Sequence, residues 1–255
     1  TQRDRARYTY MIPSFLLYNR EELQKLFTSV LGPNTRNGRS PRDPLSVEEM
    51  QQLSSTLYKF RATPHHLTRL QEALEQYEGS LSFHNFTSKK SADDANARRF
   101  IISFQTQAPI IMEGGLEWIP TQVVGQSFLL HQIRKMASLA IDVARGGCAT
   151  LETIQQALSP TSNMNLNLAP AQGLFLDMSF FEGYNRRKTN AHLENLDWIT
   201  DESTPAVQRW KDFRENVVMK HVGTEEVEQC NFIKYLYVQE YVYDCKNQYK
   251  IKEQK

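Results

Sequence analysis

Four short segments rich in β-branched and aromatic residues constrain the fold of this chain more than any other feature. They span residues 7–18, 98–106, 116–124 and 174–181. Such side chains favour strands, and each segment is bounded by turn-forming residues. Pro13 predicts a strand end or a sheet edge. Residues 80–90 give no regular pattern and are interpreted as irregular.

Helical segments separate these predicted strands. Ser46 with Glu49 forms a capping box, and Thr63-Pro64 is typical of a helix start. Ser127 is predicted to cap a helix that runs to about Arg145, and a short helix follows Thr150. The order β, α, α, loop, β, β, α, α, β predicts an α+β layer with helices packed on one face of a sheet.

The pattern changes after residue 183, which predicts a first unit at 1–183 and a mostly helical C-terminal extension at 184–255. Thr204-Pro205 is predicted to open one helix and Thr224 another. The second helix carries an apolar stripe, which either docks on its own domain or receives a partner. The stripe consists of Phe232, Ile233, Leu236 and Tyr237.

The composition and net charge of the chain exclude few classes of function. The formal net charge is +1 over 255 residues, so any nucleic-acid surface must be a local basic patch. No apolar run is long enough to span a bilayer. Three cysteines without a C-x-x-C pair favour free thiols in a reducing, intracellular compartment. The chain begins with Thr1 rather than Met and enters a strand segment almost at once, which favours an internal start.

Polar residues in the segment 125–136 are candidates for a functional site. Helical spacing predicts that Ser127, His131 and Arg134 share one face of a mostly apolar helix. Such a stripe is either a solvated face or a cleft in which the arginine meets a carboxylate. Tyr8 is likewise either a packed strand aromatic or a ring that stacks on a nucleic-acid base. His65-His66 lacks a third metal ligand, and no phosphate-loop, dinucleotide or zinc signature is present.

Taken in order, these segments resemble TruA-type tRNA pseudouridine synthases, most closely the eukaryotic branch that modifies several tRNA positions. The resemblance runs from about residue 7 to 223. It is carried by Ala6-Arg7-Tyr8-Thr9-Tyr10, Phe83-His84-Asn85-Phe86-Thr87-Ser88, Gly125-Gln126-Ser127-Phe128, His131-Gln132-Ile133-Arg134-Lys135-Met136, Ala169-Pro170 with Gly173-Leu174, and Tyr184-Asn185 before Leu196-Asp197-Trp198. The family fold, two similar α+β halves with an antiparallel sheet and a cleft between them, implies that this chain is the second half.

The resemblance also implies the roles of individual residues. Tyr8 matches the tyrosine that stacks on the target uracil, Arg134 the basic residue that pairs with the nucleophilic aspartate, and Leu176 the apolar residue that lines the pocket. The Arg-Thr-Asp-x-Gly segment that carries this aspartate is absent, and Asp4 does not match it. Phosphate contacts are expected from Lys89, Lys90, Arg98, Arg99, His131 and Lys135.

The implied reaction isomerises uridine in RNA, most readily tRNA, to pseudouridine without a metal or organic cofactor. The implied partner besides RNA is the missing N-terminal half of the same protein, and the implied location is the nucleus or mitochondrion. The first predicted strand, as an unpaired edge, is expected to lie near that missing half. The alternative is a non-catalytic RNA-binding or scaffold protein, derived from a synthase, in a larger ribonucleoprotein.

Overall fold

One antiparallel sheet organises the part of the chain that the structure, a computed structural model, describes: residues 3–32, 44–88, 90–187, 192, 196, 204–242 and 249–251. Its strands follow the order β2–β3–β5–β1–β6, and the short β4 pairs with β5 outside this path. The strands are β1 (Arg5–Pro13), β2 (Gly79–Ser82), β3 (Arg98–Thr106), β4 (Ile110–Ile111), β5 (Glu117–Gly125) and β6 (Leu174–Phe180). The antiparallel α+β prediction is confirmed.

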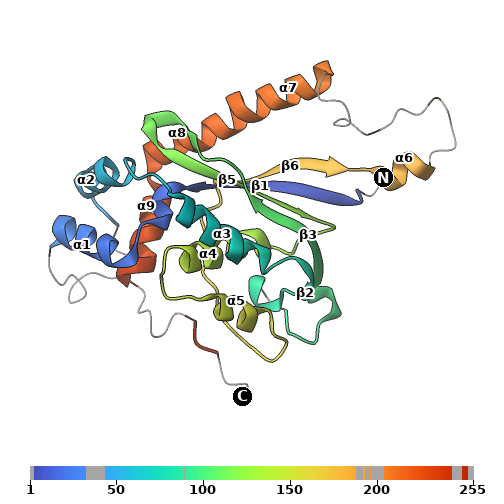
Figure 1. Cartoon of the computed structure of the whole chain (residues 1–255), viewed down its shortest axis with the longest axis horizontal. Helices are drawn as coiled ribbons and strands as arrows, with labels where there is room; N and C mark the ends of the chain where they lie inside the picture. The colour runs from blue at the N-terminus through green and yellow to red at the C-terminus, as the bar shows by residue number, and fades with distance from the viewer. Residues whose placement is uncertain are drawn as a thin grey trace.

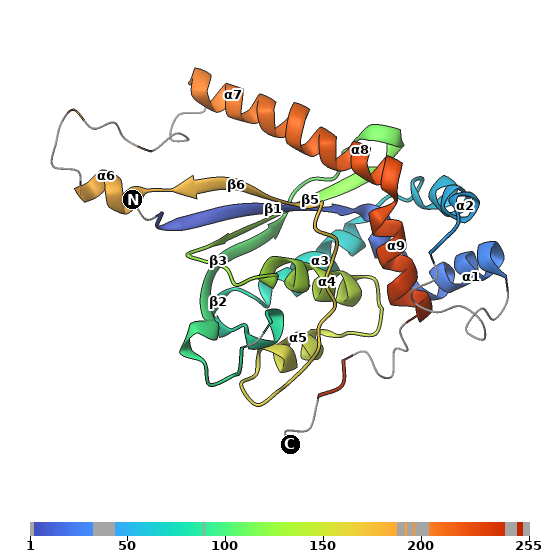
Figure 2. The same cartoon turned by 180° about the vertical axis from the view of Figure 1, so that it is seen from behind.

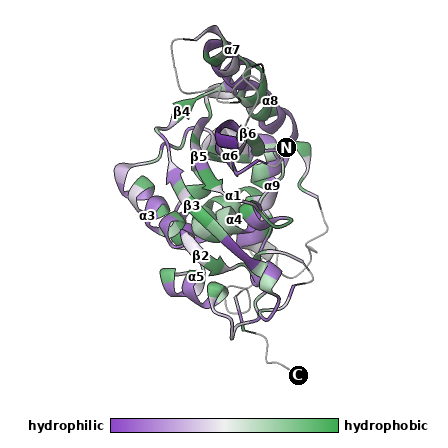
Figure 3. Ribbon diagram, turned by 90° about the vertical axis from the view of Figure 1, so that its right-hand side faces the viewer, coloured by the Kyte–Doolittle hydropathy of each residue, from purple (hydrophilic) through white to green (hydrophobic). Residues whose placement is uncertain are grey.

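Helices cover both faces of this sheet. They are α1 (Arg20–Leu31), α2 (Val47–Leu57), α3 (Pro64–Glu75), α4 (Gln132–Ala144), α5 (Leu151–Leu158), α6 (Glu182–Arg187), α7 (Pro205–Phe213), α8 (Lys220–Gln229) and α9 (Asn231–Tyr237). Helices α3, α4 and α5 lie under one face, whereas α7 and α8 run across the opposite side (Figures 1 and 2). The view along the sheet in Figure 3 shows this three-layer order, with α7 and α8 at one extreme and α5 at the other.

Helix α4 is the centre of the main helical layer. It packs against α3, and nearly all of its side chains are buried, from Ile133 to Ala144. The hydroxyl of Tyr77 donates to the carbonyl of Met136, 3.1 Å away. A helix buried on most of its circumference gives a rigid support for any side chain that it directs toward the sheet.

The first strand is not an edge, which corrects the expectation drawn from its sequence. Strand β1 pairs along its length with β5 on one side and β6 on the other. Pro13 ends it, as predicted, and a 3₁₀ turn (Ser14–Leu17) follows. The edges of the described sheet are β2 and β6, so the unpaired backbone groups lie there.

One other local prediction is wrong, and two further features were not predicted. Residues 79–82 form β2, although the segment from residue 80 was interpreted as irregular. A register shift between Ile101 and Ser103 breaks the alternation of β3, so Phe104 is buried while Phe100 and Ile102 are exposed. Helix α1 was missed, although Asn19 caps it by accepting the N–H of Glu21. The loop predicted at 32–44 lies mostly outside the described residues.

Of the two predicted starts of C-terminal helices, one lies at the predicted residue and the other does not. Thr204 caps α7 as expected, accepting the N–H of Val207. A π-helical stretch, Arg214–Met219, leads from α7 into α8, so Thr224 lies inside a helix rather than at its start. The break comes at Cys230, a non-glycine residue with φ of 53°.

The apolar stripe of α9 docks on its own domain. Phe232, Ile233 and Leu236 are fully buried in the main core, and Phe232 meets Tyr10 and Trp118 edge-on. This outcome contradicts the alternative that the stripe receives a partner. Cys230 is a free thiol, as expected, whereas Cys148 is disulfide-bonded, so the expectation of free thiols is wrong there.

No described helix combines the length and apolar character required to cross a membrane. Likewise, the described histidines, cysteines and acidic residues include no cluster of three that could hold a metal ion.

Candidate active site

A pocket of about 570 Å³ lies where β1, the start of α4 and the segment before β6 meet. Tyr8 enters it from β1 and Arg134 from the first turn of α4. Its other walls are Phe128, Leu129, Leu130, His131, Gln132, Ile133, Ala171 and Leu174. The volume lies within the range of small-ligand sites, and the wall is mainly apolar with one cation.

Tyr8 is held from the side by another ring. Phe128 contacts it edge-on, with centroids 5.3 Å apart and planes at 81°. Alternation along β1 places Tyr8 and Tyr10 on the face that meets α4, and Arg7 and Thr9 on the other. An edge-on neighbour restrains a ring while leaving its faces available, the geometry that stacking on a planar base requires.

The turn before α4 replaces the predicted cap at Ser127. Helix α4 begins at Gln132, and His131 precedes it in the left-handed region with φ of 67°. The fully buried Gln132 accepts the N–H of Leu129 through its side-chain carbonyl at 2.8 Å. Ser127 and His131 therefore do not share a helical face with Arg134, and the predicted stripe is wrong. His131 still lines the pocket, but from the turn.

Arg134 is fixed by one nitrogen and keeps its outer amino groups for another partner. Its Nε donates to the carbonyl of Ala169 at 2.7 Å, and the buried Tyr10 donates its hydroxyl to the next carbonyl, of Pro170, at 2.9 Å. Burial lowers the pKa of this guanidinium, which nevertheless stays charged in proteins. Within the described part of the chain no carboxylate pairs with Arg134. Among the described residues, the site thus holds a half-buried cation without a paired anion.

Leu176 stands beside Tyr8 rather than deep in the pocket. The two residues are direct cross-strand partners on β6 and β1, and Leu176 is 50% exposed. Leu174, the partner of Tyr10, is the leucine of this strand that lines the cavity. Both leucines lie on the same face as the tyrosines, because direct partners in an antiparallel pair share a face.

The expected phosphate-contacting residues have different surroundings. Lys89 lies outside the described residues. The structure leaves Arg98 exposed, pairs Lys90 with Asp94 at 2.5 Å, and directs Arg99 to the carbonyls of Asn96 and Arg98. Of the described residues in this set, His131 alone is in the wall of the pocket.

Lys135 binds the backbone of a neighbouring turn. Its Nζ donates to the carbonyls of Asn85 and Thr87, at 3.1 and 3.3 Å, and burial lowers its pKa. His84 and Asn85 are buried and bind the segment at 157–164 through Ser162. The motif at 83–88 therefore has a structural part in joining α4 and α5.

Sequence reasoning missed four residues around the site: Tyr10, Phe128, Gln132 and Asp177. Tyr10 and Phe128 were visible as aromatics in the motifs, but their contacts depend on tertiary packing. Gln132 offered no signal beyond a polar residue between apolar ones. Asp177 is the one acidic residue within β6, and its side chain is fully buried against Arg7.

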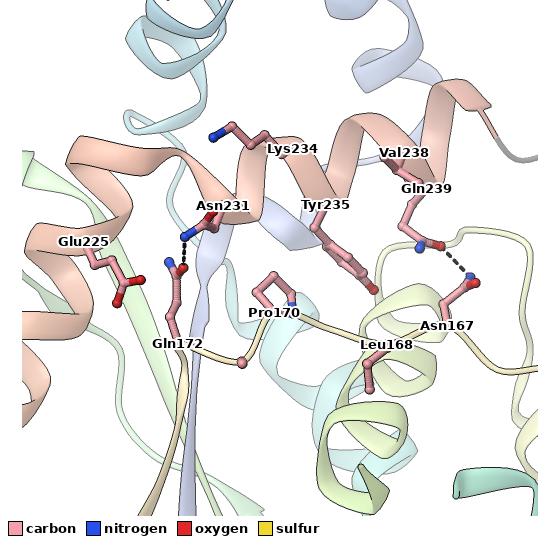
Figure 4. A pocket seen from close by; sticks show the side chains of 11 residues that line it. Asn167, Leu168, Pro170, Gln172, Glu225, Asn231, Lys234, Tyr235, Val238 and Gln239 are labelled. Atoms are coloured by element: carbon pink, nitrogen blue, oxygen red, sulfur yellow. Dashed lines mark hydrogen bonds between the residues drawn. The ribbon is translucent and has the colours of Figure 1, made fainter. Parts of the chain in front are cut away.

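A second groove, of about 820 Å³, adjoins the pocket at Ala171 and lies between the segment 167–172 and α9. Figure 4 shows that amide side chains cross it in pairs, Gln172 with Asn231 and Asn167 with Gln239. Lys234 and Glu225 bring opposite charges to its wall. These amide pairs join the segment before β6 to α9 and the turn that follows it.

Comparison with known proteins agrees with this geometry. Residues 73–182 match the family model for tRNA pseudouridine synthase. Among curated relatives, tRNA pseudouridine synthase 1 of Kluyveromyces lactis is 31% identical over 210 residues, which cover 81% of this chain and 37% of that protein. The human pseudouridylate synthase 1 homolog is 34% identical over 171 residues, covering 67% and 38%.

A third relative, the tRNA pseudouridine(27/28) synthase of Saccharomyces cerevisiae, is 32% identical over 199 residues, covering 76% of this chain and 51% of that protein. The chain thus spans about a third to a half of the length of these three relatives. On the combined agreement of motifs, fold and relatives, the chain belongs to the family of TruA-type tRNA pseudouridine synthases.

Proposed function

We propose that this chain supplies the tyrosine and arginine side of a site that isomerises uridine to pseudouridine in tRNA, as part of a longer enzyme. The observation that carries the proposal is Arg134: it lines one pocket with Tyr8, is anchored by its Nε, and has no described carboxylate partner. An arginine in this state suits bidentate pairing with an incoming aspartate.

In this proposal the target uridine leaves its stack and enters the pocket between Tyr8 and Arg134. Stacking on Tyr8 offsets part of the unstacking free energy, which is a few kcal/mol. The nucleophilic aspartate comes from a segment with the Arg-Thr-Asp-x-Gly pattern, which this sequence lacks. Asp4 does not supply it, because its carboxylate accepts the N–H of Gly183 in the first turn of α6.

The guanidinium of Arg134 would keep that aspartate ionised and oriented. The N1–C1′ bond then breaks, the uracil rotates within the pocket, and a C5–C1′ bond forms; C5 loses its proton to solvent, and N1, freed from the ribose, gains one. Atoms and charge balance without an oxidant or reductant. The residues named here bind and orient; none needs to carry a redox change.

The test replaces Arg134 in the natural full-length protein and measures pseudouridine in tRNA by mass spectrometry of nuclease digests. We expect Arg134→Ala to lose at least about 10²-fold in rate, the usual cost of removing one preorganised charged or hydrogen-bonding group. Arg134→Lys keeps the charge but not the planar fork, and is expected to recover only part of the activity.

The matched control is Arg209→Ala, which removes an exposed arginine of α7 and should leave the rate unchanged. Near-normal pseudouridine formation by Arg134→Ala would remove the proposed role. A wild-type protein that binds tRNA without modifying it would instead favour the scaffold alternative, for which the buried α9 stripe gives no support.

A further inference from the structure

Strand β6 contains an irregularity that decides which residue faces Tyr8. Arg7 pairs with Met178, but Tyr8 pairs with Leu176, so Asp177 is an extra residue in the ladder. An uninterrupted ladder would place Asp177 opposite Tyr8 and Leu176 opposite Thr9, on the other face. The β-bulge at Asp177 therefore brings Leu176 beside Tyr8.

The side chain of Asp177 is fully buried on the opposite face of the sheet from the pocket. Its Oδ2 accepts the Nε–H of Arg7 at 2.7 Å, while Gln122 approaches the same oxygen at 3.4 Å. Its Oδ1 is buried without a hydrogen-bond partner among the described residues. A buried carboxylate is costly unless paired, so the bulge depends on Arg7, the residue directly before Tyr8.

Helix α7 of the C-terminal extension covers this ion pair. The indole of Trp210 donates to the backbone carbonyl of Asp177 at 3.2 Å. The guanidinium carbon of Arg7 lies 5.5 Å from the Trp210 ring centroid, and that of Arg214 lies 5.2 Å from it. One helix thus holds both the backbone of the bulge and the cation that neutralises Asp177.

We propose that Asp177, held by Arg7 and Trp210, is a positioning residue that sets the register of Tyr8 and Leu176, and that α7 thereby contributes to the site. This inference rests on the proposed function for its catalytic consequence. Asp177 does not serve as the missing nucleophile, because it lies behind the sheet and is already paired. Its effect on the reaction is transmitted through the backbone of β1 and β6.

The first experiment measures kcat and KM for tRNA in the natural full-length protein carrying Asp177→Asn, which keeps shape and removes charge. A displacement of the pocket by a fraction of an ångström to 1 Å predicts a fall in kcat of about 10- to 100-fold. KM is expected to change by less than about threefold, because none of the residues expected to contact phosphates lies on β6.

The matched control is Glu182→Gln, which breaks the ion pair between Glu182 and Arg5 at the same end of β1 and β6. It removes a carboxylate at the start of α6, just beyond β6, without touching the bulge, so kcat should stay within about twofold of wild type. A similar fall in kcat for Glu182→Gln and Asp177→Asn would overturn the specific role of the bulge.

A second measurement needs no activity. In wild-type protein, nuclear Overhauser contacts between the Tyr8 ring and the Leu176 methyls are expected, since direct cross-strand Cβ atoms lie about 5 Å apart. Trp210→Ala should weaken them, whereas Trp210→Phe, which keeps a ring over Arg7, should retain most of them. If Asp177→Asn fails to fold, the two Trp210 variants still test whether the bulge positions Tyr8 and Leu176.

The two readouts separate this inference from the proposed function. Contacts between Tyr8 and Leu176 that persist in folded Asp177→Asn and Trp210→Ala would overturn the positioning role. Contacts that are lost while kcat is unchanged would also overturn it. If the wild-type protein makes no pseudouridine, the proposed function fails, and so does the catalytic part of this inference, while the contacts still report whether the bulge sets the register.

Discussion

At the scale of single residues, Glu226 is the buried acid with the clearest thermodynamic consequence. It lies fully buried at the junction of α8 and α9, where its carboxyl oxygens accept the N–H groups of Phe232 and Ile233. Burial raises its pKa from 4.5 to about 7, although these hydrogen bonds act in the opposite direction. The folded protein therefore binds a proton more tightly here than the unfolded chain does.

The sign of the pH dependence follows from that difference. The contribution of Glu226 to stability is fully present below pH 4.5 and is lost as the pH rises through about 7. We expect the free energy of unfolding to fall by up to about 3 kcal/mol over this window. Urea denaturation at a series of pH values should show this slope in wild type and not in Glu226→Gln.

The control is Glu225→Gln, one residue earlier, where the side chain is 25% exposed and faces His221. It should leave the slope between pH 5 and 8 as in wild type. An equal slope in Glu226→Gln would show that another group titrates in this range and that Glu226 stays ionised.

At the scale of elements, the turn that begins α4 sets the position of the pocket wall. Gln132 holds this turn by accepting the N–H of Leu129, and the turn carries Phe128 against Tyr8. Gln132→Ala leaves a buried N–H without a partner, so we expect a loss of about 1–3 kcal/mol in unfolding free energy. Chemical denaturation measures this loss, and Gln126→Ala, an exposed amide in the same turn, should show none.

Activity gives a second test of the same turn. If Phe128 restrains Tyr8 through this contact, Gln132→Ala should lower kcat in the full-length protein at temperatures where the variant is fully folded. Stability and kcat that both match wild type would mean that the buried hydrogen bond does not hold the turn.

Elements whose ends are set by local chemistry were predictable from the sequence. Thr63-Pro64 and Thr204-Pro205 begin helices because an N-cap and a proline act within one turn. The break at Cys230 and the start of α4 after His131 were not predictable, since both use the left-handed backbone that usually marks glycine or asparagine. Tertiary contacts decide these two positions.

The candidate site, too, was predictable only in part from the sequence. The resemblance placed Tyr8 and Arg134 on one cleft, and the structure puts both in the wall of one pocket. It could not show that Leu174 lines the cavity while Leu176 flanks Tyr8, because that depends on the bulge. Nor could it show that Lys135 binds backbone carbonyls, since such contacts join segments 50 residues apart.

At the scale of the whole molecule, a buried ion cluster joins the C-terminal extension to the α+β body. Arg145, at the end of α4, pairs with Asp142 of the same helix and with Glu240 beyond α9. Glu240 also lies 3.2 Å from Arg20 on α1. The side chains of Arg145, Asp142 and Glu240 are 1–4% exposed, so solvent screens these charges little.

Removing the cation from this cluster should therefore destabilise the whole chain. Arg145→Met leaves two buried carboxylates short of a partner, and we expect a loss of about 3–5 kcal/mol in unfolding free energy. Denaturation followed by both near-ultraviolet circular dichroism and tryptophan fluorescence should remain a single transition, because α9 and α4 share one core.

The double variant Arg145→Met/Glu240→Gln should lose less than the sum of its single variants, since the second change removes a charge that the first left unpaired. Asp94→Asn, in the half-buried surface pair with Lys90, should leave stability nearly unchanged. Additive losses, or two separate transitions, would mean that the extension folds independently of the body and that the cluster does not join them.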